Sequence, residues 1–175
     1  HMFRVSPAEQ AISHFKRTVC AVLAGASVEG GPIDESYVHE AAEFVCYANE
    51  RFVHSRRHLS DTDLRTCYEL NLSVPAWKGG LVPFGTAGYA WVPESLRSSR
   101  GGKHVTAEPV LCLGWQDMYS KVYKVLTPHG TVRHTSKVTW HHDQPLGKLL
   151  PVRERDMCLP SSDKSTVEYD HEVVE

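Results

Sequence analysis

The chain has few of the features that identify a metal-binding protein or a disulfide-bonded one. Its five cysteines are Cys20, Cys46, Cys67, Cys112 and Cys158, and no two of them form a Cys-x-x-Cys pair. No short His/Cys spacing of the zinc-finger kind is present either. We therefore interpret the cysteines as small buried hydrophobic residues in a reducing compartment, and we predict no metal site and no cofactor.

Long hydrophobic runs are also missing. No apolar stretch near the N-terminus resembles a signal peptide, and no window approaches the length of a membrane span. We therefore expect a nuclear or cytoplasmic protein that is not secreted and has no membrane partner. His1-Met2 resembles a vector-derived residue before an initiator methionine. If Met2 is native, the gene product begins there, and a truncated gene product is expected.

The motifs of the common hydrolases are absent as well. No phosphate-binding loop and no nucleophile elbow frames the Ser, His, Asp and Cys residues. Four histidines, His129, His134, His141 and His142, lie near one another in the sequence. Their spacing does not require a metal ion, and positions in turns or at strand edges are the favoured interpretation. We therefore predict no free-standing hydrolase.

The net charge of −2 is unevenly distributed along the chain. Residues 1–80 carry eight Lys/Arg against ten Asp/Glu, whereas residues 81–150 carry eight against four. Residues 151–175 carry three against seven. The central part is therefore basic and is followed by an acidic tail, which is expected to lie near the basic surface or to remain disordered.

Residues 1–78 are expected to form two or three helices. Apolar residues recur at three- and four-residue steps through residues 8–26, and again on one face of residues 35–52. Ser6 suits an N-cap, Pro7 suits the first helical position, and Glu9 suits the carboxylate of a capping box. A short third helix is expected from Ser60.

The pattern changes from Gly79 onward to short β-branched and aromatic runs separated by turn residues. Strands are predicted near residues 86–92, 108–115, 120–127, 131–135 and 137–141. Because five short strands bury little as an open sheet, we predict that residues 79–148 close into a small five-stranded β-barrel. Residues 149–175 are expected to be an acidic, flexible and disordered tail. The expected fold class is α+β.

A series of motifs follows one order through residues 5–143. It includes Tyr47-Ala48-Asn49-Glu50-Arg51, Thr66-Cys67-Tyr68-Glu69-Leu70, Phe84-Gly85, Leu111-Cys112-Leu113-Gly114-Trp115, Lys121-Val122-Tyr123-Lys124-Val125 and Ser136-Lys137-Val138-Thr139-Trp140. In this order and spacing, the chain resembles the C-terminal part of Ty1/copia-type retrotransposon integrases. The resemblance implies that residues 1–78 are the end of an RNase H-like core, and that residues 79–148 are an SH3-like barrel.

The resemblance also indicates what catalysis would need. Glu9 matches the third catalytic carboxylate of the family, but the two catalytic aspartates have no counterpart in this chain. Gln10 and Cys67 stand where the family has Arg and Pro. Because the two-metal reaction cannot be assembled from one carboxylate, no enzyme activity is expected. Glu9 is interpreted first as a capping residue; the alternatives are a relic of the catalytic Glu, or a donor to a site completed by another chain.

The predicted function is non-catalytic binding of DNA or RNA through its phosphates. The candidate residues lie on a Ser/Gly-rich loop and on the strands: Arg97, Arg100, Lys103, His104, Lys121, Lys124, Arg133 and Lys137. Solvated charge on a mobile segment is the alternative for the loop. Trp115, Tyr123 and Trp140 could stack on bases, but we favour a role in the barrel core.

A domesticated, retrotransposon-derived protein-interaction or dimerisation module is the alternative function. Helices that once covered an RNase H-like sheet would expose an apolar face, and such a face favours a partner. The candidate contact residues are Ile12, Phe15, Val19 and Val22 on the first helix. A homodimer would bury residues 8–26 and 37–52.

Overall fold

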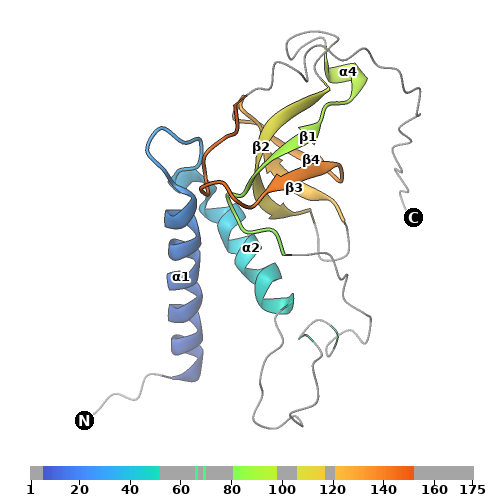
Figure 1. Ribbon diagram of the computed structural model, residues 1–175. Helices are drawn as coiled ribbons and strands as arrows, with labels where there is room; N and C mark the ends of the chain where they lie inside the picture. Colours follow the sequence, from blue (N-terminus) through green and yellow to red (C-terminus); the bar gives the residue numbers. More distant parts are fainter. Residues whose placement is uncertain are drawn as a thin grey trace.

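The computed structural model describes residues 6–51, 66, 69, 81–97, 106–116 and 121–151. The elements in chain order are α1 (Pro7–Ala26), η1 (Glu35–Tyr37), α2 (Val38–Arg51), β1 (Ala87–Trp91), α4 (Glu94–Arg97), β2 (Ala107–Trp115), β3 (Tyr123–Leu126), β4 (Val132–Thr135) and β5 (Val138–His141). The α+β class is confirmed (Figure 1). The helix predicted from Ser60 lies outside the described residues, apart from Thr66 and Glu69. The tail predicted over residues 149–175 also lies outside them, apart from residues 149–151.

Helix α1 begins at the predicted capping box. The Ser6 hydroxyl accepts a hydrogen bond from the Glu9 amide at 3.2 Å, and the Glu9 carboxylate accepts one from the Ser6 amide at 2.8 Å. Pro7 occupies the first turn, where its missing N–H costs no helical hydrogen bond. Two amides that would otherwise lack partners are thereby satisfied.

The helix predicted over residues 35–52 consists of a 3₁₀ turn, η1, that leads into α2. The Asp34 carboxylate caps η1 by accepting hydrogen bonds from the amide and the hydroxyl of Ser36. These hydrogen bonds stabilise the charged carboxylate and hold the pKa of Asp34 below its ordinary value.

The five strands form one antiparallel sheet in the order β4-β3-β2-β1-β5. Consecutive strands pair along most of this order, and β5 returns to pair with β1, placing Tyr89 opposite Thr139 and Ala87 opposite His141. Among the described residues, β4 and β5 form the two edges and do not pair with each other. The predicted closed barrel is therefore wrong, although all five predicted strands are present.

The sheet nevertheless curves strongly around one of its faces. Tyr123 of β3 and Trp140 of β5 make an edge-to-face contact with ring centroids 5.2 Å apart, although β2 and β1 separate their strands. Gly88 permits this approach, because a Cβ at that position would lie 2.7 Å from the Trp140 ring. Ala90, Val110 and Val125 are buried on the same inner face. This face is filled by side chains across the curve, so closure is not needed to bury it.

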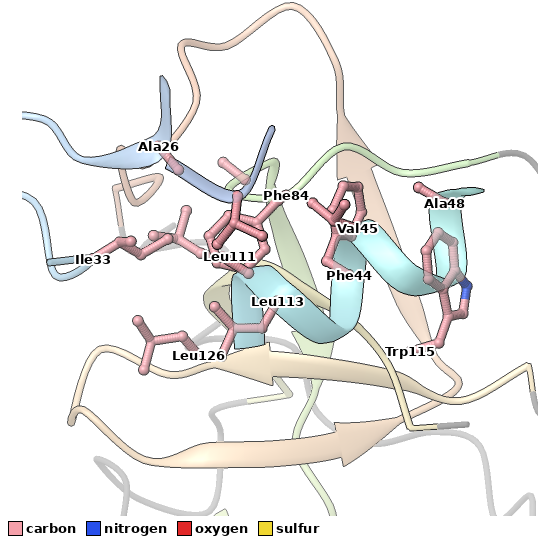
Figure 2. Packing of buried hydrophobic residues seen from close by; sticks show 13 residues of the cluster. Ala26, Ile33, Phe44, Val45, Ala48, Phe84, Leu111, Leu113, Trp115 and Leu126 are labelled. Carbon is pink, nitrogen blue, oxygen red and sulfur yellow. The ribbon is translucent and has the colours of Figure 1, made fainter. Parts of the chain in front are cut away.

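The opposite, outer face packs on the helices. Figure 1 shows α2 between α1 and the sheet. Phe44 of α2 stacks on Trp115, with centroids 5.9 Å apart, and meets Phe84 edge to face at 5.7 Å. Figure 2 shows Phe44, Val45 and Ala48 among the side chains of Leu111, Leu113, Trp115 and Leu126. Burial of these large side chains makes this cluster the main core.

The end of α1 is joined to the sheet by close backbone contacts. Gly147 donates its amide hydrogen to the Gly85 carbonyl at 2.7 Å, and both glycines have positive φ angles. A Cβ on Gly147 would lie 1.7 Å from the Ala26 carbonyl oxygen. Only glycine fits this junction, where the end of α1 and the segment after β5 meet the chain just before β1. None of the described helices is long and apolar enough to cross a membrane.

Candidate functional site

The outer face of the sheet has a covered part and an open part. Side chains alternate between the two faces of a strand, so Ala87, Tyr89 and Trp91 of β1 point to the same side. Ala87 is fully buried in the core with Leu111, whereas Trp91 remains 37% exposed. Helix α2 therefore covers one end of this face and leaves the other end open.

An open groove of about 520 Å³ occupies the uncovered part. Its lining residues are Tyr89, Trp91, Ala107, Ser136, Lys137, Val138, Thr139 and His141. The strand register explains their convergence. Ala107 pairs with Trp91, and Thr139 pairs with Tyr89, while the Trp91 amide donates to the Lys137 carbonyl at 3.1 Å. Lys137, directly before β5, and Thr139 and His141 within it occupy alternate positions and face the same side as the two β1 aromatics.

The aromatic side chains of the groove are held by their neighbours. Tyr89 and His141 make an edge-to-face contact with ring centroids 5.6 Å apart. The Tyr89 hydroxyl donates a hydrogen bond to the Pro151 carbonyl at 2.6 Å. The Arg97 guanidinium lies over the Trp91 indole, 4.9 Å from its centroid, in a cation–π contact. These contacts fix two aromatic rings at the wall of the groove before any ligand arrives.

The charge of the groove is of one sign. None of the described residues that line it carries a carboxylate, and Lys137 is exposed. Arg97 adds a second cation behind Trp91. The hydroxyls of Ser136 and Thr139 add hydrogen-bonding groups. The groove therefore offers aromatic surface, positive charge and hydroxyls to an anionic ligand with flat rings.

Arg97 is less accessible than its predicted role implies. Only 6% of it is exposed, and its Nε donates to the Val92 carbonyl at 3.2 Å. Helix α4 returns the chain after β1, so that Arg97 reaches back to Trp91. Arg97 therefore positions the indole. The other three residues of the predicted basic loop, Arg100, Lys103 and His104, lie outside the described residues.

Two of the predicted strand cations are engaged in ion pairs within the fold. Lys124 pairs with the carboxylate of Glu43 on α2. The same carboxylate lies 3.2 Å from Nε2 of His39. Arg133 pairs with Glu108 at 2.9 Å. Lys121 and Lys137 are exposed, but only Lys137 lines the groove. Of the predicted cations that the structure describes, Lys124 and Arg133 are paired within the fold and only Lys137 lines the groove.

The other predicted residues are accounted for by the fold. Trp115 belongs to the main core, and Tyr123 and Trp140 pack together on the inner face. Glu9 is exposed and serves as the capping carboxylate. Among the described residues, no three His, Cys, Asp or Glu side chains are grouped so that they could hold a metal ion.

The predicted partner face of α1 is divided. Ile12 is 55% exposed, and Val19 is buried. Phe15 and Val22 are partly buried against the main core. Three of the four predicted face residues are therefore engaged by contacts within the chain, and Ile12 remains exposed.

Sequence reasoning missed Tyr89, Trp91, Thr139 and His141 as groove residues. The available signal was the alternation of Tyr89 and Trp91 within one predicted strand, and of Lys137, Thr139 and His141 within another. The pairing of these two strands was not predictable from alternation alone. Comparisons of the chain with protein-family models, with curated proteins and with solved structures each found no match.

Proposed function

We propose that the chain is a non-catalytic nucleic-acid-binding module that holds a single-stranded segment of DNA or RNA in the β1–β5 groove. One observation carries the proposal: the groove combines exposed Trp91 with Lys137 and has no carboxylate among its described lining residues. Proteins that bind single strands use this combination, with aromatic rings that stack on bases and cations that follow the phosphates.

The stacking geometry favours a single strand over a duplex. A base can stack on a protein aromatic ring only when its own face is accessible, and bases inside a duplex cover one another. Trp91 lies in the groove wall and is braced by Arg97. Little side-chain freedom remains to be lost when a base stacks on it, which lowers the entropic cost of binding.

We further propose that the module derives from a copia-like integrase and that its curved sheet is SH3-like. The support is the order of motifs along residues 5–143 and the antiparallel order β4-β3-β2-β1-β5, in which the last strand returns to the first. The proposed role is to bind nucleic acid for an integration machinery or a domesticated descendant of one. No catalytic step is assigned to it.

Dimerisation through α1 is the weaker candidate. Its support is the exposure of Ile12, while Val19 is already buried within the chain and Phe15 and Val22 are partly buried there. We therefore expect a monomer.

Fluorescence anisotropy of a labelled single-stranded oligonucleotide, titrated at low and near-physiological salt, tests the groove. We expect Lys137→Gln to weaken binding. The slope of log K against log salt should decrease in magnitude by about one, because one phosphate contact is lost. Trp91→Ala is expected to cost about 1–3 kcal/mol of binding free energy. Trp91→Phe should retain part of the affinity, because it keeps a ring in the groove wall.

Lys121→Gln is the matched control, because Lys121 is exposed, carries the same charge and does not line the groove. It should change binding less than Lys137→Gln does. An equal loss from both lysine variants would show diffuse electrostatic attraction. Absence of binding at low salt would overturn the proposed function.

A further inference from the structure

The described part of the chain ends at the wall of the groove. Tyr89, which lines the groove, donates its hydroxyl hydrogen to the carbonyl of Pro151 at 2.6 Å. Leu149 and Leu150 are partly buried against the main core. These contacts fix Pro151, from which residues 152–175 continue, beside Tyr89 in the wall of the groove.

Residues 152–175 have the charge that the groove lacks. They carry seven Asp/Glu against three Lys/Arg, and from Asp156 onward the balance is six against one. The last eight residues contain Glu168, Asp170, Glu172 and Glu175 together with the aromatic Tyr169. This composition combines anionic groups with a flat ring, the two features that the groove is suited to accept.

We propose that the acidic C-terminal segment, residues 152–175, binds in the β1–β5 groove and competes there with nucleic acid. The inference rests on the proposed function and adds regulation of the same site. Lys137 is the expected partner of the segment's carboxylates, and the Trp91 indole is the expected contact of its apolar and aromatic groups. Nucleic acid then binds by displacing a segment of the same chain.

The attachment beside the groove favours this contact over an intermolecular one. A segment tethered next to its site experiences an effective concentration of about millimolar, set by the length of the connecting chain. A contact whose dissociation constant is about millimolar or lower is then substantially occupied in the absence of a competitor. Salt screens such a contact, because its charges lie near the protein surface.

The test compares two full-length variants with the same change in net charge. The first neutralises the segment with Asp170→Asn, Glu172→Gln and Glu175→Gln. The control carries Glu29→Gln, Glu35→Gln and Glu50→Gln on the helical side of the molecule. Both remove three negative charges, so they attract nucleic acid equally through net charge alone.

Oligonucleotide binding at low salt is the first readout. The segment variant is expected to bind about five-fold more tightly than the native chain, which is the lower end of typical coupling between two ligands. The control should change affinity much less. In a Lys137→Gln background, neutralising the segment should have little further effect. Equal gains from the two variants, or no gain from either, would overturn the inference while leaving the groove proposal intact.

A second readout does not require nucleic acid. The ¹⁵N-indole resonance of Trp91, assigned with Trp91→Phe, should shift when salt is raised in the native chain and should shift little in the segment variant. If no variant binds oligonucleotide, the proposed function fails. This resonance then decides the inference alone: a shift on neutralising the segment supports occupation of the groove, and an unchanged resonance overturns it.

Discussion

The guanidinium of Arg133 on β4 lies 2.9 Å from the carboxylate of Glu108 on β2, although β3 separates the two strands. Both side chains are nearly enclosed, with 13% and 6% of their surfaces exposed. Glu108 pairs in register with Ala90, and Arg133 pairs with Val125, so the ion pair borders the apolar inner face. Arg133 therefore supports the curvature of the sheet.

Removing one partner of this pair should destabilise the fold strongly. Glu108→Leu leaves the Arg133 charge enclosed without its carboxylate, and we expect a loss of about 3–5 kcal/mol in the free energy of unfolding. The double variant Glu108→Leu/Arg133→Met should recover most of this loss, because it removes both charges from the low-dielectric interior. Urea unfolding measures both values. A small effect of Glu108→Leu alone would show that water reaches the pair.

The junction between α1 and the sheet should tolerate no side chain at Gly147. Gly147→Ala would place a Cβ 1.7 Å from the Ala26 carbonyl oxygen at a φ of 75°, so the backbone must move. Gly130→Ala is a matched control, because Gly130 has a φ of 74° and no atom within 4 Å of the added Cβ. It should cost only the conformational penalty, about 1–2 kcal/mol. Thermal unfolding of the two variants should differ clearly, and equal costs would contradict the close approach.

The Cys112 thiol should be inert in the folded protein. Burial raises its pKa to about 12, above the value of about 8.5 for a thiol in an unfolded chain. As pH rises through about 8.5, the unfolded chain ionises first, so this thiol's contribution to stability decreases from there toward pH 12 by about 1.4 kcal/mol per unit. A Cys112→Ala variant should lack this component of the alkaline loss.

Alkylation followed by peptide mass spectrometry provides the direct check. Cys20 and Cys46 are exposed and should react with iodoacetamide under native conditions. Cys112 should react only after denaturant is added. Labelling of Cys112 at the rate of Cys20 would contradict its burial.

Two substitutions on α1 should separate packing within the chain from packing between chains. Val19 is 5% exposed and Ile12 is 55% exposed, so Val19→Glu should destabilise the monomer strongly, while Ile12→Glu should change its stability by no more than about 0.5 kcal/mol. Light scattering at two concentrations should give a monomer mass for the native chain. If the native chain is a dimer and Ile12→Glu dissociates it, the alternative function, dimerisation through α1, would be supported instead.

Local signals predicted the elements of this fold well. Ser6, Pro7 and Glu9 specify the start of α1 through hydrogen bonds that neighbouring residues make with one another, and such contacts are readable from spacing. The five strands coincide with β-branched and aromatic runs between turn residues, and these runs are also local patterns that can be recognised from sequence. A core role for the sheet tryptophans was also favoured in advance, because a small barrel needs large side chains in its core. Trp115 is buried in the main core, and Trp140 is partly buried against the inner face.

Long-range contacts account for what was missed. Side chains that meet across the curved inner face, such as Tyr123 and Trp140, bury that face without closure of the sheet. Such contacts join residues that are distant in sequence, so local patterns do not show them. Arg97 is predicted from sequence as a phosphate contact on a Ser/Gly-rich loop, but α4 returns it to Trp91. Lys124 and Arg133 are likewise engaged by Glu43 and Glu108, which are distant in sequence. Charge along the sequence alone therefore does not show which of these described cations the fold engages internally.

The return of β5 to β1 has a thermodynamic consequence for the groove. Lys137, Thr139 and His141 reach the groove only when β5 is docked on β1, and this pairing closes the longest loop among the strand pairs. A ligand that contacts both strands binds only the docked state. It therefore raises the free energy needed to detach β5 from β1 by RT ln(1 + [L]/Kd). Amide hydrogen exchange along β5 would therefore slow as the groove fills, whether its occupant is a nucleic acid or the chain's own acidic segment.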